Sequence, residues 1–330
     1  SGVCRLCTLL SPRSGNLPAG REDRSRRDCV WNVMTRRRRY AVPLPGAGPL
    51  QLGVRTLVMG IVNVTPDSFS DGGLCFDPGR AVAHALQMEA AGADVLDVGG
   101  ESTRPGAAAL PDDEELARVV PVLRGLMGQV RAPVSIDTYK VRVAQAALDL
   151  GATIVNDVSG LLYEPELAEV VASRGAALVL MHNRGRSREM YRDAEYADVG
   201  REVVAELANR IAVAVDSGVG RSRIIVDPGL GFAKRAEHSY EALASIGELV
   251  SLDRPILVGP SRKSFLAAED DAGPTEREWE TAAAVTAAVL EGAHIVRVHQ
   301  VAELARVVRV VDRILARRSA TDAARKRAAS

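Results

Sequence analysis

The sequence has few cysteines, no long apolar run and no net charge, and each absence excludes a class of protein. Of its four cysteines, three lie within the first 29 residues and only Cys75 lies in the rest of the 330-residue chain. This usage is not a disulfide framework, and it favours a reducing cytoplasm as the location. No apolar run approaches the ~18 residues that a transmembrane helix needs. The composition, 47% hydrophobic and 25% charged, is typical of a soluble globular protein.

The net charge of zero hides an asymmetry along the chain. Residues 1–40 hold ten arginines and three acids, so this segment carries +7 and the remaining 290 residues carry −7. Because binding to phosphate backbones needs clustered positive charge, the mildly acidic body argues against nucleic acid as the main partner.

Residues 1–50 have no sustained periodicity and are rich in Ser, Gly, Pro and Arg. We expect a basic, disordered extension, either a tail or a start-site artefact with Met34 as the native start. A targeting segment is the alternative, since the stretch is Arg-rich and acid-poor but lacks a clear amphipathic helix. Cys4 and Cys7 could bind metal, although no second cysteine pair accompanies them. At the other end, residues 318–330 are expected to form a polar C-terminal tail.

Eight short apolar runs organise residues 51–317. They are separated by ~20–45 residues of mostly helical pattern, which predicts repeated βα units. Eight units, with no Gly-rich fingerprint after the first strand, favour an α/β fold with a single (β/α)8 TIM barrel over a doubly wound open sheet. We expect strands at 57–63, 94–98, 133–136, 153–156, 176–181, 223–226, 255–258 and 294–298, and helices at about 78–91, 112–127, 139–150, 164–173, 197–217, 237–249, 277–291 and 300–317.

Each apolar run ends in a polar or ionisable residue, and barrels of this kind carry their chemistry at the C-terminal ends of the strands. Asp137, Asn156 and Asp227 each end a strand, so we expect them at low dielectric in one mouth. Together with Lys263 they suit a planar heterocycle such as a 2-amino-4-oxo pyrimidine, whose two adjacent N–H groups can donate to one carboxylate. Salt bridging between these acids and Lys263 in the barrel core is the alternative.

A second group of strand-end residues suits an anion and a metal ion. Arg297 and His299 alternate along one strand and therefore share a face, which makes a good polyanion site. The carbonyl oxygen of Asn63 suits a hard cation such as Mg²⁺. Arg104 lies among Ser and Thr hydroxyls, an arrangement that suits a carboxylate or a phosphate. The polar loop 63–73 is either a solvent loop or a lid that handles phosphate.

Taken together, these motifs resemble those of the dihydropteroate synthases, a pterin-binding family of the folate pathway. They cover about residues 57–317 in the expected order, and the matching stretches are MGIVNVTPDSFSDGG, DVGGESTRPGA, SIDTYK, IVNDVSG, LVLMH, DPGLGFAK, SRKSFL and RVHQV. The resemblance implies a transferase that joins 6-hydroxymethyl-7,8-dihydropterin pyrophosphate to p-aminobenzoate and yields 7,8-dihydropteroate and pyrophosphate. It also implies a Mg²⁺ cofactor, a homodimer, a sulfonamide target and an SN1-like substitution without a protein nucleophile.

The resemblance assigns roles to three sets of residues. The implied pterin pocket consists of Asp137, Asn156, Asp227 and Lys263, with Met181 lining it. The implied pyrophosphate and Mg²⁺ site consists of Asn63, Arg297 and His299. The implied aminobenzoate site and its surrounding loops consist of Thr103, Arg104, Pro105, Phe232 and Ser261. Of all these, Asp137, Asp227, Lys263 and Arg297 are expected to be the catalytic residues.

Some features depart from the family pattern, and two rival functions remain open. After LVLMH the chain continues with Asn183-Arg-Gly, and residues 1–50 have no counterpart in the family core. No pyrophosphokinase domain is evident, so we expect a monofunctional enzyme. A pterin-dependent methyltransferase on the same barrel has no need for Arg104 or the SRK motif, both of which are intact. A catalytically silent pterin-binding homologue is the second rival. The sequence assigns no role to His182.

Overall fold

Eight parallel strands form the centre of the protein. The computed structural model describes residues 37–65, 77–102, 109–185, 191–192, 194–267 and 273–328. The strands follow the order β8-β7-β6-β5-β4-β3-β10-β9. A bridge between Val226 and Ile256 brings the two edges together, which makes a nearly closed barrel. The strands are β3 (Leu57–Asn63), β4 (Val95–Gly99), β5 (Val134–Asp137), β6 (Ile154–Asp157), β7 (Ala177–Met181), β8 (Ile224–Asp227), β9 (Leu257–Val258) and β10 (Ile295–Val298).

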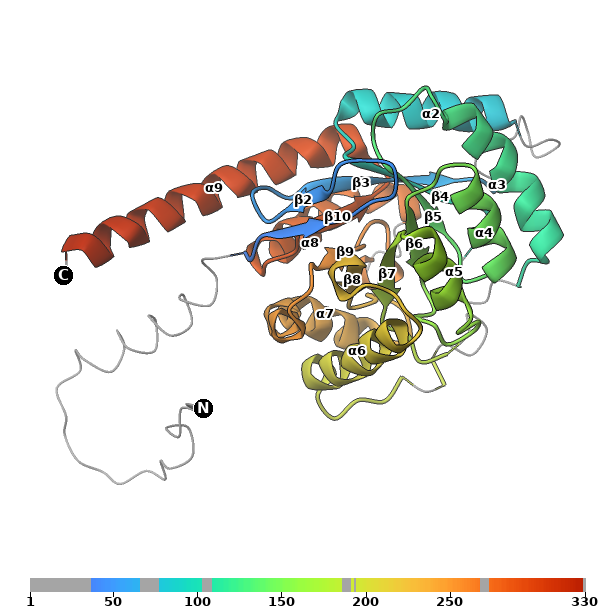
Figure 1. The fold of residues 1–330 in the computed structure, drawn as a ribbon. Coiled ribbons are helices and arrows are strands. Elements are labelled where there is room, and N and C mark those ends of the chain that lie inside the picture. The colour runs from blue at the N-terminus through green and yellow to red at the C-terminus, as the bar shows by residue number, and fades with distance from the viewer. Residues whose placement is uncertain are drawn as a thin grey trace.

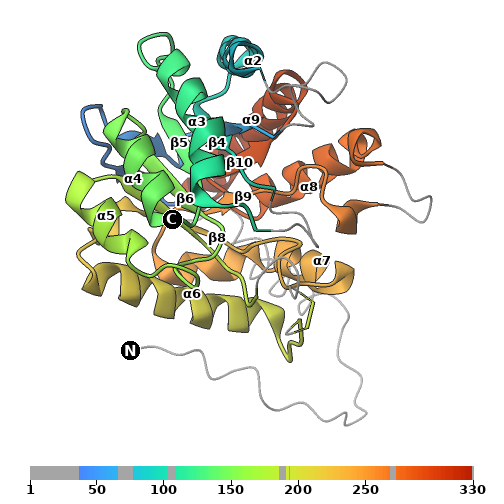
Figure 2. The same ribbon diagram turned by 90° about the vertical axis from the view of Figure 1, so that its right-hand side faces the viewer.

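Helices alternate with these strands and surround the barrel (Figures 1 and 2). This arrangement confirms the predicted TIM barrel, and the predicted strand bounds agree to within one or two residues. No helix among the described residues is long and apolar enough to cross a membrane. The helices are α2 (Pro78–Ala91), α3 (Asp112–Leu126), α4 (Val141–Asp149), α5 (Leu167–Arg174), α6 (Val199–Asp216), α7 (Ala236–Ala244), α8 (Glu278–Leu290) and α9 (Val301–Ala328), with 3-10 turns η1 (Arg221–Arg223), η2 (Ile246–Leu252), η3 (Ser264–Leu266) and η4 (Pro274–Glu276).

The strands are apolar on both faces because both are covered, as is usual for parallel sheets. One apolar layer lies between the strands and the helices and includes Val58, Leu96 and Val296. The other fills the barrel and includes Met59 and Ile225. The polar residues that interrupt this pattern gather at the C-terminal ends of the strands, where they are available for chemistry.

A short hairpin closes the N-terminal end of the barrel, which corrects the predicted boundary at residue 51. Strands β1 (Tyr40–Val42) and β2 (Leu50–Leu52) pair antiparallel. Their apolar side chains pack on the barrel interior near Leu57 and Ile295. The prediction of a disordered extension is therefore wrong for residues 37–50, because strands of three residues are too short to produce a recognisable periodicity. Residues 1–36 lie outside the described part of the chain.

Helix α9 is longer than predicted. Its predicted end was residue 317, followed by a polar tail, whereas the helix continues to Ala328 and extends beyond the barrel in Figure 1. Its last turns are rich in Ala, Arg and Lys, which are good helix formers, and contain no Gly or Pro to end it. Closer to the barrel, Asp312 accepts hydrogen bonds from Arg37 at 3.0 Å and from the Thr56 N–H at 2.8 Å.

The hairpin should contribute measurably to stability. Leu52 is 1% exposed whereas Val54, two residues later, is 72% exposed. We expect Leu52→Ala to lower the free energy of unfolding by about 2–4 kcal/mol, because it leaves a cavity at the closed end of the barrel. The matched variant Val54→Ala should change it by less than about 0.5 kcal/mol. Urea unfolding of both variants tests this, and equal effects would contradict the packing of the hairpin.

Candidate active site

The predicted strand-end residues lie at one end of the barrel on neighbouring strands. Asp137 of β5 is in register with Asn156 of β6. Met181 of β7 is likewise in register with Asp227 of β8. Asn156 and Asp227 are buried, and the side chain of Asp137 is 9% exposed. These side chains therefore lie at the same end of the barrel and are shielded from solvent.

Arg297 of β10 lies between two carboxylates. Its Nε donates to Oδ2 of Asp97 at 2.6 Å, and its Nη2 donates to Oδ2 of Asp137 at 2.5 Å. Asn156 also donates to Oδ2 of Asp97, at 3.0 Å. Arg297 therefore contacts the carboxylates of the predicted heterocycle pocket. The sequence had grouped it with Asn63 and His299. Within the described residues, Oδ1 of Asp97 and Oδ1 of Asp137 are buried and accept no hydrogen bond.

Asp97 is the site residue that the sequence analysis missed. It lies inside strand β4 and its side chain is fully buried, whereas Asp137 and Asp227 were recognisable because they end their strands. The available signal was a single acid within the apolar run Val95–Gly99. A buried carboxylate is costly unless it is paired, so this residue alone predicted a buried cation nearby. That cation is Arg297.

Lys263 and Asp227 lie on the opposite side of the mouth, next to an apolar wall. The ammonium of Lys263 lies 3.8 Å from the centroid of the Phe232 ring, a cation–π contact. Phe232 packs with Met181 and Val158. Asp227 accepts a hydrogen bond from the N–H of Gly229 at 2.7 Å. A flat ligand between this wall and the acids would meet apolar faces and polar edges.

Burial brings the pKa values of the site groups toward neutrality. It raises the pKa of Asp137 to about 7, against the opposing charge of Arg297. It also raises the pKa of Asp227 to about 6, against a hydrogen bond from Gly229 and the charge of Lys263. Burial and the charge of Arg297 lower the pKa of Lys263 to about 8. Perturbed titratable groups gathered in a cleft are typical of functional sites.

Three further predicted residues form a smaller polar group. The hydroxyl of Ser261 lies 2.9 Å from Nδ1 of His299, and the His299 N–H donates to the same hydroxyl at 3.2 Å. Nδ2 of Asn63 lies 3.4 Å from Nε2 of His299. The structure thus brings Asn63 and His299 together as predicted, and it adds Ser261 to them. Thr103, Arg104, Pro105 and residues 66–73 of the polar loop lie outside the described residues.

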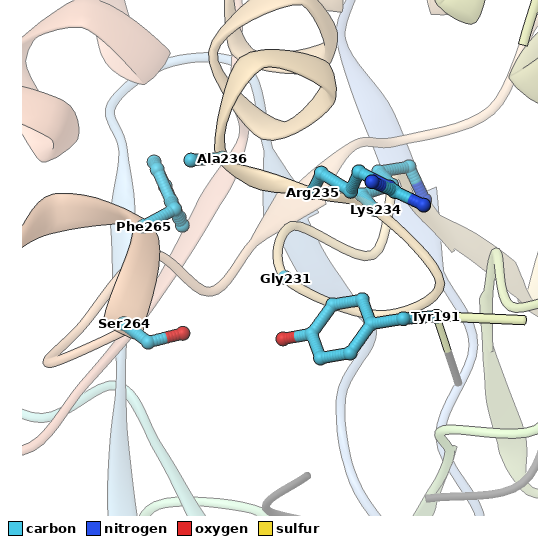
Figure 3. A pocket seen from close by; sticks show the side chains of 7 residues that line it. All are labelled: Tyr191, Gly231, Lys234, Arg235, Ala236, Ser264 and Phe265. Atoms are coloured by element: carbon cyan, nitrogen blue, oxygen red, sulfur yellow. The ribbon is translucent and has the colours of Figure 1, made fainter. Parts of the chain in front are cut away.

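A pocket of about 510 Å³ opens beside Phe232 and Lys263. Its lining comes from the segments that follow β7, β8 and β9, and Figure 3 shows the hydroxyl groups of Tyr191 and Ser264 pointing toward one another across it. Helix α7 begins at the pocket with Ala236, and no side chain caps this N-terminus. Neither Ser264 nor Arg235 was among the residues predicted for the site. The lining residues are Tyr191, Gly231, Lys234, Arg235, Ala236, Ser264 and Phe265.

Comparison with known proteins assigns this geometry to a family. A family model described as pterin binding enzyme matches residues 59–299. The chain is 43% identical to the dihydropteroate synthase of Synechocystis sp. over 275 residues, which are 83% of this chain and 95% of that protein. It is 48% identical to the dihydropteroate synthase of Mycobacterium leprae over 261 residues, 77% of this chain and 92% of that protein.

Solved structures agree with the sequence relatives. The Xanthomonas albilineans dihydropteroate synthase with 4-aminobenzoic acid superposes with a TM-score of 0.76 at 40% identity, covering 83% of this chain and 98% of that one. The Yersinia pestis enzyme in complex with a sulfonamide drug superposes with a TM-score of 0.77 at 38% identity, with the same coverage of both chains. The chain therefore belongs to the dihydropteroate synthase family of pterin-binding enzymes, which are transferases of folate biosynthesis.

Proposed function

We propose that the pterin ring of the substrate binds between Asp137, Asn156, Asp227 and Lys263, with Met181 and Phe232 against its faces. The observation that carries this proposal is the pair of buried carboxylates at the ends of β5 and β8, with the half-buried ammonium of Lys263 beside them over the Phe232 ring. The exocyclic amine and ring N–H of a pterin donate to a carboxylate, while Lys263 donates to the ring carbonyl or a ring nitrogen. The acceptor oxygen Oδ1 of Asp137 has no protein partner among the described residues, which supports a ligand donor there.

The pyrophosphate is proposed to bind near Asn63, His299 and Arg297. Arg297 carries a fixed charge between two acids, so it can hold an anion while it remains part of the pterin site. His299 adds a ring nitrogen that Asn63 and Ser261 hold in position. These groups stabilise the charge that develops on the oxygen of the leaving pyrophosphate.

The residues present fit a Mg²⁺ ion of the kind that binds mainly to substrate. No group of three His, Cys, Asp or Glu in the described ranges could hold a metal. However, Mg²⁺ usually keeps several waters and takes few protein oxygens beside substrate phosphates, so the carboxamide oxygen of Asn63 is a suitable single ligand. A bound Mg²⁺ would supply positive charge to the departing pyrophosphate.

The reaction that these groups favour is an SN1-like substitution at the pterin methylene. As pyrophosphate departs, the methylene gains cationic character, which the nearby carboxylates of Asp137 and Asp227 offset. The aniline nitrogen of p-aminobenzoate then attacks while the site holds both substrates in line. This route uses no protein nucleophile.

The aminobenzoate carboxylate is proposed to bind in the pocket of Figure 3. The hydroxyl of Ser264, the side chain of Arg235 and the uncapped N-terminus of α7 all favour a negative charge there. Phe232 directly follows Gly231 of this pocket and its ring contacts Lys263, so the ring suits the aromatic body of the substrate. A related structure, from Xanthomonas albilineans, was solved with 4-aminobenzoic acid. Thr103, Arg104 and Pro105 stay predicted members of this site.

An assay of pyrophosphate release by the purified protein tests the proposed function. Dihydropterin pyrophosphate is incubated with and without p-aminobenzoate and Mg²⁺, and dihydropteroate is measured in parallel. We expect dihydropteroate and pyrophosphate in equal amounts when all three are present. A methyl-transferring pterin enzyme or a silent homologue would produce no dihydropteroate. The predicted homodimer and cytoplasmic location stay predictions, and light scattering of the purified protein tests the first.

The value of kcat/KM should fall as the pH decreases through 7 and then through 6. The pKa is raised to about 7 for Asp137 and to about 6 for Asp227, so each acid becomes protonated and uncharged as the pH falls through that value. A protonated carboxyl accepts the two pterin N–H groups poorly. We expect log kcat/KM to have a slope of about one between these pKa values and about two below them. A flat profile down to about pH 5 would contradict a requirement for ionised acids.

A further inference from the structure

A chain of buried polar groups runs behind the pterin site, from the segment after β8 to helix α6. Lys234 is 1% exposed, and its ammonium contacts Nδ1 of His182 at 2.7 Å and the carbonyl oxygens of Gly229 and Phe232 at 3.2 Å each. Nε2 of His182 lies 3.1 Å from Oε2 of Glu206. These hydrogen bonds lie outside the pterin site as proposed above, although Gly229 and Phe232 contribute to that site and Lys234 also lines the pocket of Figure 3.

The number of hydrogen bonds at Lys234 assigns which ring nitrogen of His182 carries the proton. An ammonium has three N–H donors, and Lys234 has three acceptors: two carbonyl oxygens and Nδ1 of His182. Nδ1 is therefore unprotonated, and Nε2–H donates to the Glu206 carboxylate. Burial and the charge of Lys234 lower the pKa of His182 to about 4, which keeps the imidazole neutral. Against the effect of its burial, hydrogen bonds from His182 and Arg184 lower the pKa of Glu206 to about 2.

The same chain holds the turn that positions two site residues. The N–H of His182 donates to the carbonyl oxygen of Asp227 at 2.9 Å. Gly229 has a φ of 66°, and a Cβ there would lie 2.0 Å from the carbonyl oxygen of His182. The turn from Asp227 to Phe232 therefore packs closely against the end of β7. Lys234 donates hydrogen bonds to two carbonyl oxygens of this turn. A shift of this turn would move both the Asp227 carboxylate and the Phe232 ring.

We propose that Lys234 is a positioning residue of the pterin site, which fixes the Asp227–Phe232 turn and adds a buried positive charge to those of Lys263 and Arg297 near Asp227. His182 and Glu206 hold the ammonium in place, so the chain gives His182 a role that the sequence did not reveal. The proposal rests on the proposed function, because it assigns the pterin ring to Asp227.

The charged groups around Asp227 and Lys234 come from neighbouring helices, strands and loops. Asp227 faces Lys263, Arg297 and Lys234, each of which lowers its pKa against the effect of burial. Burial lowers the pKa of Lys234 to about 7, opposed by Asp227 and Glu206 and assisted by Arg184 and Lys263. Loss of the Lys234 charge should therefore raise the pKa of Asp227 further.

Arg184 stabilises the far end of the chain. It donates to Glu202 at 2.6 Å and pairs with Glu206. Its guanidinium also lies 3.8 Å from the centroid of the Tyr196 ring. Tyr196 in turn donates its hydroxyl to the carbonyl oxygen of Ala233 at 2.9 Å. The backbone next to Lys234 is therefore fixed by the Tyr196 hydrogen bond to Ala233 as well as by Lys234 itself. We expect this backbone to keep its position when the side chain of Lys234 is replaced by one of similar length.

The first experiment compares Lys234→Met with Arg37→Met. Both remove a buried, hydrogen-bonded cation, but Arg37 pairs with Asp312 at the N-terminal end of the barrel. Lys234→Met should raise KM for dihydropterin pyrophosphate by about tenfold or more at neutral pH and move the second break of the kcat/KM profile up by about one pH unit. Arg37→Met should lower stability and leave both quantities unchanged. If Lys234→Met lowers only stability, Lys234 is structural and the proposal is overturned.

A second pair of variants decides the matter if Lys234→Met does not fold. His182→Gln retains one acceptor for Lys234 and one donor for Glu206, whereas His182→Leu retains neither. Binding of dihydropterin pyrophosphate, measured by calorimetry without p-aminobenzoate, should stay near wild type in the first and weaken by about tenfold in the second. Equal affinities of the two variants would overturn the proposal. If the wild-type protein itself binds no pterin, the proposed function fails instead.

Discussion

Replacing Asp137 with asparagine is expected to lower the turnover of dihydropteroate formation by more than ~10²-fold, because the pterin ring loses the group that orients it. The carboxylate at the end of β5 has one oxygen bound to Arg297 and a second with no partner among the described residues. Asparagine retains a single acceptor oxygen and places an N–H₂ donor where the pterin also presents donors. Both the hydrogen bonds and the negative charge opposite the developing cation are lost.

The measurement is the initial rate of dihydropteroate formation at saturating substrates, with a control at the other end of the barrel. Asp94 lies just before β4, accepts from the N–H of Val58 at 2.9 Å and pairs with Arg55. Asp94→Asn removes a comparable polar contact and should leave the turnover within about threefold of wild type, since surface changes rarely exceed ~0.5 kcal/mol. A normal rate in Asp137→Asn would remove this residue from the site.

Lys263→Met is expected to have an effect of similar size, more than ~10²-fold in turnover, because it removes the only proposed donor to the pterin carbonyl or ring nitrogen. The ammonium lies over Phe232, and its partial burial brings its pKa down to about 8. Methionine keeps the length of the side chain and its packing against the ring but has no charge. Loss of that charge also raises the pKa of Asp227 and of Asp137, since Lys263 lowers both.

Two measurements separate these effects from a general loss of stability. Arg174→Met removes an exposed ion pair with Asp149, at 2.9 Å on the barrel surface. Such pairs contribute only about 0–1 kcal/mol, and its turnover should match that of the wild type. The acid limb of Lys263→Met should move to higher pH while that of Arg174→Met stays in place. Turnover of Lys263→Met within about tenfold of wild type would contradict the proposed contact with the pterin.

Some of the site could be predicted from the residues and some could not. Asp137, Asn156 and Asp227 were recognisable because a polar residue at the end of an apolar strand is unusual, and the barrel brings all strand ends to one mouth. Asp97 lies inside its strand, so it could not be recognised as a polar residue at a strand end. The partner of Arg297 was predicted to be a phosphate alone, whereas its guanidinium contacts Asp97 and Asp137. The pocket proposed for aminobenzoate is lined by residues of three segments that are distant in the sequence, so their proximity could not be predicted.

The barrel, its approximate strand bounds and its family were predictable from the sequence, because these depend on local periodicity and on motifs whose residues are adjacent in the chain. Three features became visible only in the folded protein: the hairpin that closes the barrel, the ion pairs that join β4, β5 and β10, and the contact of Lys234 with His182. Each of these joins segments far apart in the chain. The physical reason is that such contacts arise from burial: a paired charge is stable inside a protein only where the fold brings its partner within hydrogen-bond distance.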